Sequence, residues 1–263
     1  MGAGCASIGR KGGAMQIRNS SIADFLRCRR RYYYAWVENL RPIAEEEHLK
    51  IGELFHQSLK KYYSAGPEEA IRSLPDSIHA EKVKRLLIAY IEHYKGNDFT
   101  PQIAEETFSA NLPNGCIFTF TPDLIVKHGD TLAIVEHKTT SRDIDEFTTS
   151  LVHYDQQTLR YMAGLRQIGI NINTVIFNVV QITGPEFVRR EVQRDERLIE
   201  KAWQELLVIA EEVRKEKVFL MSYNELCRYC PYEVLCLAEK TGLDSTIIKE
   251  GYFIKEEHEG IQA

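Results

Sequence analysis

The chain has 263 residues, of which 44% are hydrophobic and 27% charged, so it can bury a sizeable core and has an ordinary globular composition. The formal net charge of −5 argues against a protein that coats nucleic acid through an overall basic field. No apolar run approaches the roughly 20 residues that span a bilayer, and the Gly-rich start has no sustained apolar stretch. We therefore expect a cytoplasmic protein with no membrane partner.

The N-terminal half of the chain is predicted to be helical. A flexible lead-in over residues 1–17 precedes Ser20 and Ser21, which are typical helix caps ahead of an apolar periodic run. Helical segments are expected at about 20–36, 51–63, 68–74 and 79–95. The last two form a helical insert over about 64–100, which begins at a Gly-Pro pair.

The C-terminal half mixes strands with helices. The elements expected there are a hairpin within about 103–138, a helix at 153–168, strands at 175–182 and 187–192, and a helix at 195–217. Residues 241–263 are expected to form a charged tail. This order fits a mixed α/β core, with a central sheet flanked by helices, rather than a sandwich or a bundle.

The hairpin carries a pattern of charged residues. Asp123 precedes its first strand, and Glu136, His137 and Lys138 lie in its second strand, after a His-Gly-Asp turn. Alternate side chains of a strand share a face, so Glu136 and Lys138 point to one side and His137 points away. If the strands pair across the turn, Asp123 lies alongside Glu136.

Two chemical interpretations fit this arrangement. Carboxylates are hard oxygen ligands for Mg²⁺ or Mn²⁺, and the neighbouring lysine can orient or deprotonate a water or offset charge on a phosphate. Alternatively, the three charged side chains form a solvated hairpin face with a cross-strand ion pair.

The cysteines suggest a second site. Three of the six form a C-x2-C-x5-C cluster at Cys227, Cys230 and Cys236. Because no secretory signal is seen, a metal or cluster site is expected rather than disulfides. Zinc and an iron–sulfur cluster both accept four thiolates, so a distant cysteine must complete the set. Cys28 is the best candidate, because it lies in a predicted helix. The alternative is that these are buried cysteines without a ligand.

Three further features are open to more than one interpretation. The basic and aromatic segment that contains Arg27, Arg30 and Arg31 could grip phosphates and stack on bases, or be an amphipathic helix with its arginines in solvent. His56 is a core histidine or, beside two carboxylates, a metal ligand. Gln157 and Tyr161 share a helix face and are either an ordinary surface pair or part of the site.

Taken together, these motifs resemble the PD-(D/E)XK nuclease superfamily, and within it the RecB-like branch that includes CRISPR-associated exonucleases. The matching segments in chain order are Gly52–His56 (G-x-x-x-H), Thr121–Asp123 (P-D, with Thr in place of the more usual residue), Glu136–Lys138 (E-x-K) and Gln157–Tyr161 (Q-x-x-x-Y). Cys28 with the C-terminal trio resembles the one-plus-three arrangement that holds a 4Fe-4S cluster in one subset.

The resemblance implies a restriction-endonuclease-like fold over residues 18–240 as a single domain, in which Cys28 closes an iron–sulfur segment at 227–236. It implies that His56, Asp123 and Glu136 bind Mg²⁺ or Mn²⁺ with the help of the His137 backbone carbonyl.

For the remaining site residues, the resemblance implies that Lys138 serves the attacking water, Gln157 positions Lys138 or the phosphate, and Tyr161 contacts DNA. The cluster, for which structural zinc is the alternative, would hold the C-terminal segment against the helix of Cys28.

The activity implied is a metal-dependent DNA exonuclease acting on ends or single strands, in recombination, repair or CRISPR adaptation, where it could have protein partners. A non-catalytic DNA-end-binding subunit, an endonuclease and an RNA-directed nuclease of the same fold are the alternatives.

Overall fold

The computed structural model describes residues 14–43 and 47–255, so most of the expected lead-in and the end of the charged tail lie outside the described residues. The chain divides into two compact units. We call Glu45–Phe108 with Phe120–Gln204 the sheet unit, and Met1–Ala44, Ser109–Thr119 and Glu205–Ala263 the terminal unit. Nothing in the sequence pattern marks this division.

The sheet unit is built on a five-stranded mixed sheet. In spatial order its strands are β3 (Pro101–Ala104), β6 (Leu124–His128), β7 (Thr131–Thr140), β8 (Thr174–Gln181) and β9 (Phe187–Gln193). Only β7 and β8 pair in parallel, and the other neighbours are antiparallel. β8 is buried over nearly its whole length, as expected for a β-branched strand covered on both faces. The predicted mixed α/β core is confirmed.

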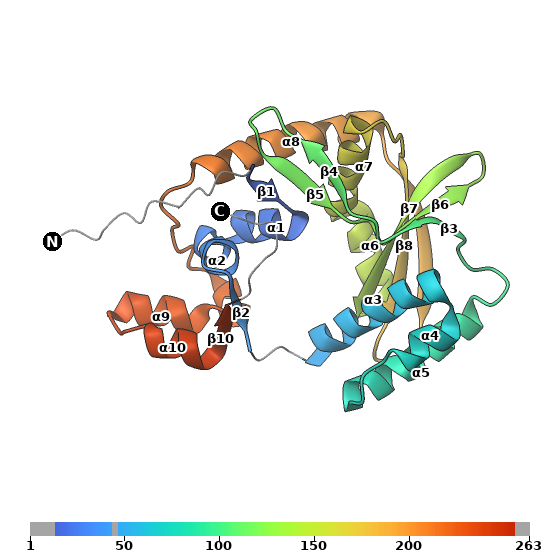
Figure 1. Cartoon of the computed structure of the whole chain (residues 1–263), viewed down its shortest axis with the longest axis horizontal. Coiled ribbons are helices and arrows are strands. Elements are labelled where there is room, and N and C mark those ends of the chain that lie inside the picture. The colour runs from blue at the N-terminus through green and yellow to red at the C-terminus, as the bar shows by residue number, and fades with distance from the viewer. Residues whose placement is uncertain (1–13, 44–46, 256–263) are drawn as a thin grey trace. The chain divides into compact units, whose positions relative to one another are not determined.

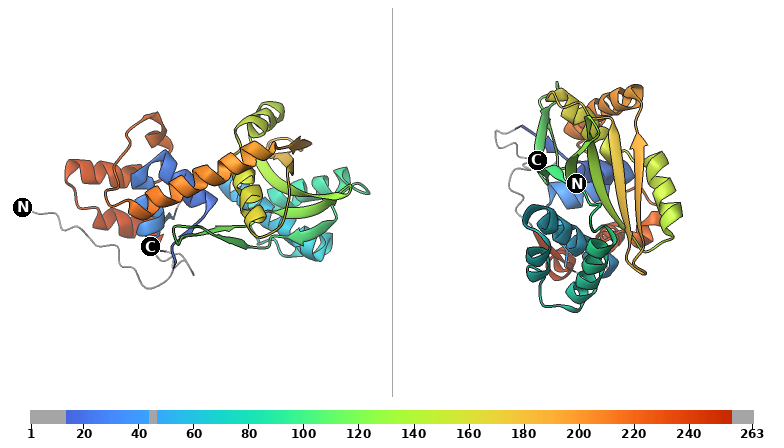
Figure 2. Two further views of the ribbon diagram at one scale, coloured as in Figure 1. Left: turned by 90° about the horizontal axis from the view of Figure 1, so that it is seen from above. Right: turned by 90° about the vertical axis from the view of Figure 1, so that its right-hand side faces the viewer.

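Helices cover both faces of this sheet (Figures 1 and 2). They are α3 (Glu47–Ala65), α4 (Pro67–Arg72) and α5 (Ile78–His93) on one face and α6 (Ile144–Tyr154) and α7 (Gln157–Gln167) on the other. The helix predicted over 153–168 is present as α7 but begins only at Gln157, because the extended backbone of Asp155 (φ −68°, ψ 118°) separates it from α6, which was not predicted. The Asp155 carboxylate then caps α7 by accepting from the backbone N–H of Thr158.

Helix α3 is held on the sheet by an apolar stripe. Ile51, Phe55 and Leu59 recur every four residues on one face and are at most 7% exposed. They pack with Leu87 and Tyr90 of α5 in one hydrophobic cluster. This packing fixes the rotation of α3, and therefore the direction in which its polar residues point.

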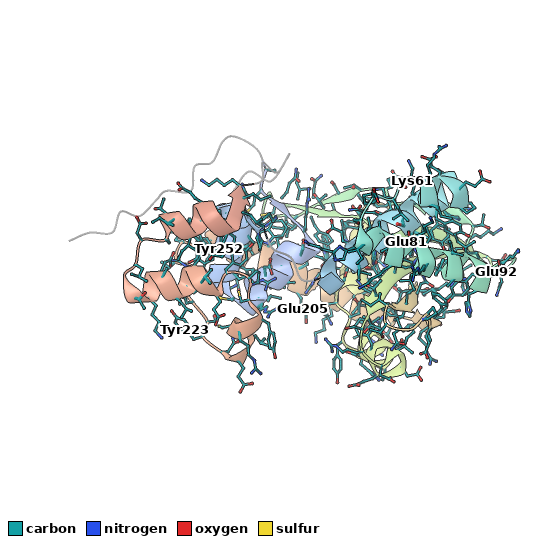
Figure 3. All side chains as sticks on the ribbon, turned by 90° about the horizontal axis from the view of Figure 1, so that it is seen from below. Lys61, Glu81, Glu92, Glu205, Tyr223 and Tyr252 are labelled. Carbon is teal, nitrogen blue, oxygen red and sulfur yellow. The ribbon has the colours of Figure 1, made fainter. Side chains whose placement is uncertain are left out.

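The terminal unit combines small sheets with short helices. Its strands are β1 (Gln16–Ile17), β5 (Ile117–Phe120) and β4 (Phe108–Asn111) in one sheet, and β10 (Phe253–Lys255) and β2 (Leu40–Pro42) in another. Its helices are α1 (Asn19–Arg27), α2 (Arg29–Tyr32), the π-helical η1 (Tyr33–Val37), the 3₁₀ turn η2 (Glu225–Tyr229), α9 (Glu233–Thr241), α10 (Thr246–Tyr252) and the C-terminal part of α8 (Glu196–Lys215). Tyr223 and Tyr252 lie at its surface, 55% and 63% exposed (Figure 3).

The helix predicted over 20–36 is interrupted at Cys28. The backbone of Cys28 is extended (φ −165°, ψ 121°), so α1 ends there and α2 begins. The interruption is stabilised because the backbone N–H of Arg30 bonds to the carbonyl of Leu220, 3.0 Å away, instead of to a helical partner. None of the described helices combines the length and apolar character that crossing a membrane requires.

Candidate active site and cysteine cavity

The predicted hairpin brings the two carboxylates together. β6 and β7 pair with Leu124 opposite Val135, which confirms the hairpin and places Asp123 alongside Glu136. Oδ2 of Asp123 accepts a hydrogen bond from the backbone N–H of His137 over 2.7 Å. The carboxylate of Asp123 is therefore held by the backbone of the strand that carries Glu136.

Glu136, Lys138, Gln157 and Tyr161 form one hydrogen-bonded chain. Nζ of Lys138 donates to Oε1 of Glu136 (2.8 Å) and to Oε1 of Gln157 (2.9 Å). Nε2 of Gln157 lies 2.8 Å from Oε1 of Glu136 and 2.8 Å from the hydroxyl of Tyr161. Tyr161 is 6% exposed and stacks on Phe120, so its contact with DNA stays a prediction.

The second polar contribution comes from α3. A Cβ at Gly52 would lie 2.8 Å from Oγ1 of Thr139, so glycine allows α3 to approach β7 closely. One turn further on, Nδ1 of His56 lies 3.8 Å from Oδ1 of Asp123, and its imidazole also hydrogen-bonds to the His137 backbone. The G-x-x-x-H spacing thus directs His56 to the carboxylates.

Sequence reasoning missed Glu105. Its backbone has a positive φ of 52°, which is uncommon for a residue with a side chain, and its N–H donates to the carbonyl of Asp123 over 3.0 Å. Nζ of Lys60, one turn beyond His56 on α3, lies 3.7 Å from its carboxylate. β3 pairs Ala104 with Leu124, so Glu105 follows the end of a strand that neighbours the one after Asp123. A carboxylate at that position could have indicated the site, but the sequence analysis treats 103–138 as one hairpin region and does not recognise β3 as a strand of its own.

Burial dominates the electrostatics of the site. Desolvation raises the pKa of Asp123 to about 7 and that of Glu136 to about 8. It also lowers the pKa of His56, and the charge of Lys138 adds to that effect. For Lys138 itself, desolvation opposes the charged form, yet the charge and hydrogen bond of Glu136 and the charge of Asp123 together raise its pKa. Lys138 is therefore an ammonium at neutral pH.

The donor set fits a divalent cation. Oε2 of Glu136 is buried and has no hydrogen-bond partner in the described part of the chain. A buried carboxylate oxygen without a partner is costly, and a cation would satisfy it. The nearby oxygens of Asp123 and the His137 carbonyl, with the nitrogen of His56, supply the hard and borderline ligands that Mg²⁺ and Mn²⁺ accept.

A separate site lies in the terminal unit, where Cys28, Cys227, Cys230 and Cys236 line one cavity of about 150 Å³. Cys227 lies in η2 and Cys230 ends it, and residues three apart in a 3₁₀ helix share a side. α9 supplies Cys236, and the interruption between α1 and α2 supplies Cys28. The four cysteines grouped from the sequence thus line one cavity, although Cys28 lies between two helices and not within one, and their role as ligands stays a prediction.

The thiols interact electrostatically. Burial raises the pKa of Cys236 to about 11, and the charges of Cys230 and Cys28 add to this increase. For Cys28, desolvation is outweighed by hydrogen bonds to backbone groups, Ser222 first, so its pKa is lowered. Four thiols facing one cavity fit either zinc or an iron–sulfur cluster. Within residues 14–43 and 47–255, however, no group of three or more His, Cys, Asp or Glu side chains is arranged so that it could hold a metal ion, and this applies to the carboxylate site as well.

The arginines expected to bind DNA differ in their surroundings. Arg30 pairs with Glu239, and Arg31 pairs with Asp24. Arg27 lines the cysteine cavity. The carboxylate partners neutralise Arg30 and Arg31 within the chain, and a DNA-binding role for the three arginines stays a prediction.

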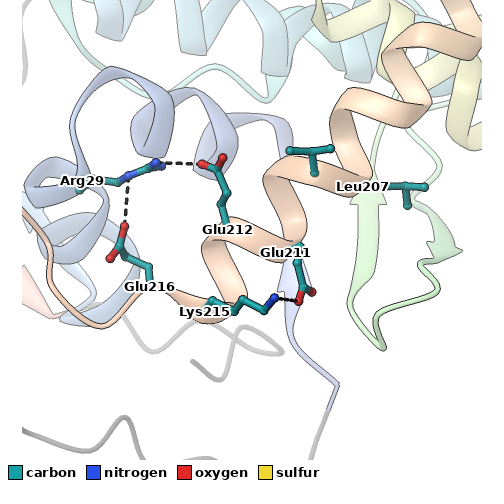
Figure 4. A pocket seen from close by; sticks show the side chains of 7 residues that line it. Arg29, Leu207, Glu211, Glu212, Lys215 and Glu216 are labelled. Carbon is teal, nitrogen blue, oxygen red and sulfur yellow. Dashed lines mark hydrogen bonds and ion pairs between the residues drawn. The ribbon is translucent and has the colours of Figure 1, made fainter.

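An open depression of about 650 Å³ also lies in the terminal unit (Figure 4). Arg29 bridges Glu212 and Glu216 there, at 2.9 and 3.2 Å, and Lys215 pairs with Glu211 at 2.8 Å. These charged side chains neutralise one another, so the depression offers no reactive group comparable to those of the sheet unit.

Comparisons with known proteins address the family and the fold. A sequence model of the PD-(D/E)XK nuclease superfamily matches residues 19–237. No curated protein matches the chain. Among solved structures, the chain is similar to a "Putative exonuclease" from Eubacterium rectale, with 14% identity, a TM-score of 0.55, and coverage of 82% of this chain and 87% of that one.

Two other solved structures are more distant. SSO0001 has 16% identity and a TM-score of 0.43, with 89% of each chain covered. LHK-Exo in complex with dAMP has 16% identity and a TM-score of 0.37, with 86% of this chain and 93% of that one covered.

Proposed function

The chain belongs to the PD-(D/E)XK nuclease superfamily, and we propose that it is a metal-dependent deoxyribonuclease that hydrolyses phosphodiester bonds at DNA ends or in single strands. The observation that carries the proposal is the buried, partnerless Oε2 of Glu136 beside Asp123 and His56. An inert DNA-binding subunit would have no need to keep this costly oxygen.

The cation, Mg²⁺ or Mn²⁺, would be held by His56, Asp123, Oε2 of Glu136 and the backbone carbonyl of His137. When bound, it would polarise a phosphate oxygen and acidify a water. Both carboxyls have a raised pKa, so they must lose protons when the cation binds. This requirement couples cation binding to pH.

Lys138 and Gln157 act beside the cation ligands. The Lys138 ammonium donates to Glu136 and Gln157, so it places a fixed positive charge where negative charge builds up on the phosphate. Gln157 fixes the direction of that ammonium, and Tyr161 fixes Gln157. Because Lys138 is charged at neutral pH, orienting the water and stabilising charge are its main roles.

The nuclease assay uses labelled single-stranded and double-stranded DNA with Mn²⁺ and with chelator. We expect Asp123→Ala, Glu136→Ala and Lys138→Ala to abolish cleavage, while Lys127→Ala, an exposed lysine of the same hairpin, stays active. Retained activity in folded Lys138→Ala protein would contradict the proposal.

The choice of an exonuclease is supported by the name of the Eubacterium rectale protein, and the other substrate classes are tested directly. A block at the end where digestion starts, whether 5′ or 3′, should prevent digestion. Circular single-stranded DNA should stay intact. Cleavage of circles would indicate an endonuclease, and cleavage of RNA alone would indicate an RNA-directed enzyme. A role in recombination, repair or CRISPR adaptation, with protein partners there, is part of the proposal.

For the second site we propose a structural 4Fe-4S cluster held by Cys28, Cys227, Cys230 and Cys236. The support is that these four thiols share one cavity. Anaerobically purified protein should be brown and contain about four irons per chain. Colourless protein with one zinc would refute the cluster in favour of structural zinc, and would leave the nuclease proposal intact.

A further inference from the structure

A buried polar cluster lies on the face of the sheet opposite to Glu136 and Lys138. Asn178 pairs in register with His137 across β7 and β8, so the two side chains share that face. Asn178 and Tyr90 have no exposed surface. The cluster joins three strands, two helices and the loop after α5, and its members are Tyr63, Tyr90, Asp98, His137, Asn178 and Arg189.

The guanidinium of Arg189 fixes which way the amide of Asn178 points. It lies over the rings of Tyr94 and Phe99, 3.4 and 3.7 Å from their centroids, and it pairs with Asp98 at 2.5 Å. A guanidinium can only donate, so the oxygen of Asn178 must face Nε of Arg189, 3.2 Å away. The amide nitrogen of Asn178 therefore points away from Arg189.

That amide nitrogen determines the protonation of His137. Nδ2 of Asn178 lies 2.7 Å from Nδ1 of His137. Because the amide donates, Nδ1 must accept, and the single proton of the neutral ring is on Nε2. Nε2 is buried and has no hydrogen-bond partner among the described residues. A proton on Nδ1 would face the N–H of Asn178 and is disfavoured.

The remaining hydroxyl protons follow from the same rule. Tyr90 accepts from Asn178 (3.0 Å) and from Arg189 (3.1 Å), so its own proton goes to the hydroxyl of Tyr63, 2.7 Å away. Tyr63 in turn donates to Asp98 (2.9 Å). The proton of each tyrosine hydroxyl thus has one acceptor. If the amide of Asn178 were flipped, its nitrogen would face the N–H of Arg189, so the flipped orientation has poorer partners.

We propose that Asn178, oriented by Arg189, is a positioning residue for the cation site of the sheet unit. It holds His137 as the neutral Nε2–H tautomer and holds the ring against Tyr63, on which it stacks at 5.6 Å. The backbone of His137 contacts both Asp123 and His56.

The inference rests on the proposed function only in that the ligand is a divalent cation, so its test measures cation binding without DNA. Asn178→Asp has the same size but presents an acceptor to Nδ1 of His137. Arg189→Met removes the group that orients the amide. Arg190→Met is the matched control, because Arg190 is the exposed neighbour on the same strand. Urea unfolding establishes that each variant is folded.

Two measurements test the positioning role. Long-range ¹H–¹⁵N spectra of histidine-labelled protein, with the signal assigned by its loss in His137→Gln, should show the Nε2–H tautomer in the wild type. Asn178→Asp presents an acceptor and should move the ring proton to Nδ1, and Arg189→Met should give a mixture of tautomers. Titration with Mn²⁺ should show a loss of affinity of about tenfold in both variants, as for other groups that orient metal ligands, and none in Arg190→Met.

The outcomes separate this proposal from the nuclease. An Nδ1–H tautomer in wild-type protein would overturn the positioning role even if both variants failed to fold. Unchanged Mn²⁺ affinity in folded Asn178→Asp and Arg189→Met protein would reduce the cluster to core packing, and a wild type that binds no Mn²⁺ would also overturn it. Mn²⁺ affinity that depends on Asn178, in a protein that cleaves no DNA, would refute the nuclease and support the positioning role.

Discussion

Replacing Gly52 by alanine should push α3 away from β7. The new Cβ would lie 2.8 Å from Oγ1 of Thr139, and ordinary contact begins at 3.4 Å, so the helix or the strand must move by 3.4 − 2.8 = 0.6 Å. Thr139 is β-branched and its χ1 is stiff, so the side chain cannot easily rotate away. His56, one turn along the same helix face, would then move relative to Asp123.

Two opposing contributions set the size of the effect. Overpacking of this kind costs about 1–3 kcal/mol. Alanine is favoured over glycine in a helix by about 1 kcal/mol, which offsets part of that cost. We therefore expect Gly52→Ala to lower the free energy of unfolding by about 0–2 kcal/mol and to raise the Mn²⁺ concentration needed for half-maximal activity.

A double-mutant cycle isolates the contact. In a Thr139→Ala background the obstructing oxygen is gone, so Gly52→Ala should stabilise the protein by about 1 kcal/mol, as helix propensity predicts. In a Thr139→Val background a methyl group replaces the oxygen, so the cost should persist. Urea unfolding at fixed pH with chelator measures all six proteins. Equal effects of Gly52→Ala in the wild-type and Thr139→Ala backgrounds would refute the argument from close approach.

The raised pKa of Glu136 means that its ionisation lowers the free energy of unfolding. The stability contributed by the protonated carboxyl is fully present below the ordinary carboxyl pKa and is lost as pH rises through about 8. With chelator, Glu136→Gln should therefore flatten the fall in unfolding free energy between about pH 5 and 8, as measured by urea titrations across that range. Gln157→Met should lower kcat about tenfold or more by releasing Lys138, whereas Gln156→Met, at the exposed neighbouring position, should leave kcat unchanged. Cys230→Ala should lose the bound iron or zinc, and Cys116→Ala, outside the cysteine cavity, should retain it by elemental analysis.

The hairpin and its motif residues could be predicted because they depend on local rules. Strand alternation placed Glu136 and Lys138 on one face, and helical spacing placed Gln157 and Tyr161 together. Glu105 could not be found this way, because its position depends on the pairing of β3 with β6 and on a positive φ that no local pattern marks.

The interruption at Cys28 was also beyond local rules. Helical periodicity continues through the segment, and at the interruption the amide of Arg30 instead donates to the carbonyl of Leu220, which lies far away in sequence. The prediction that Cys28 joins the C-terminal trio depended instead on thiolate chemistry, which requires a fourth ligand that the C-x2-C-x5-C spacing does not supply.

The site combines groups that oppose one another until a cation is present. Desolvation disfavours the ionised forms of Asp123 and Glu136, while Lys138 occupies only one oxygen of Glu136 and leaves the other buried without a partner among the described residues. A cation that binds both carboxylates would relieve the cost of burying them, so part of its binding free energy comes from removing that cost. The neutral ring of His137 fits the same logic, because a charged ring on the opposite face would compete with the cation. Binding should consequently release protons and strengthen as pH rises through about 7 to 8, the range of the two raised pKa values.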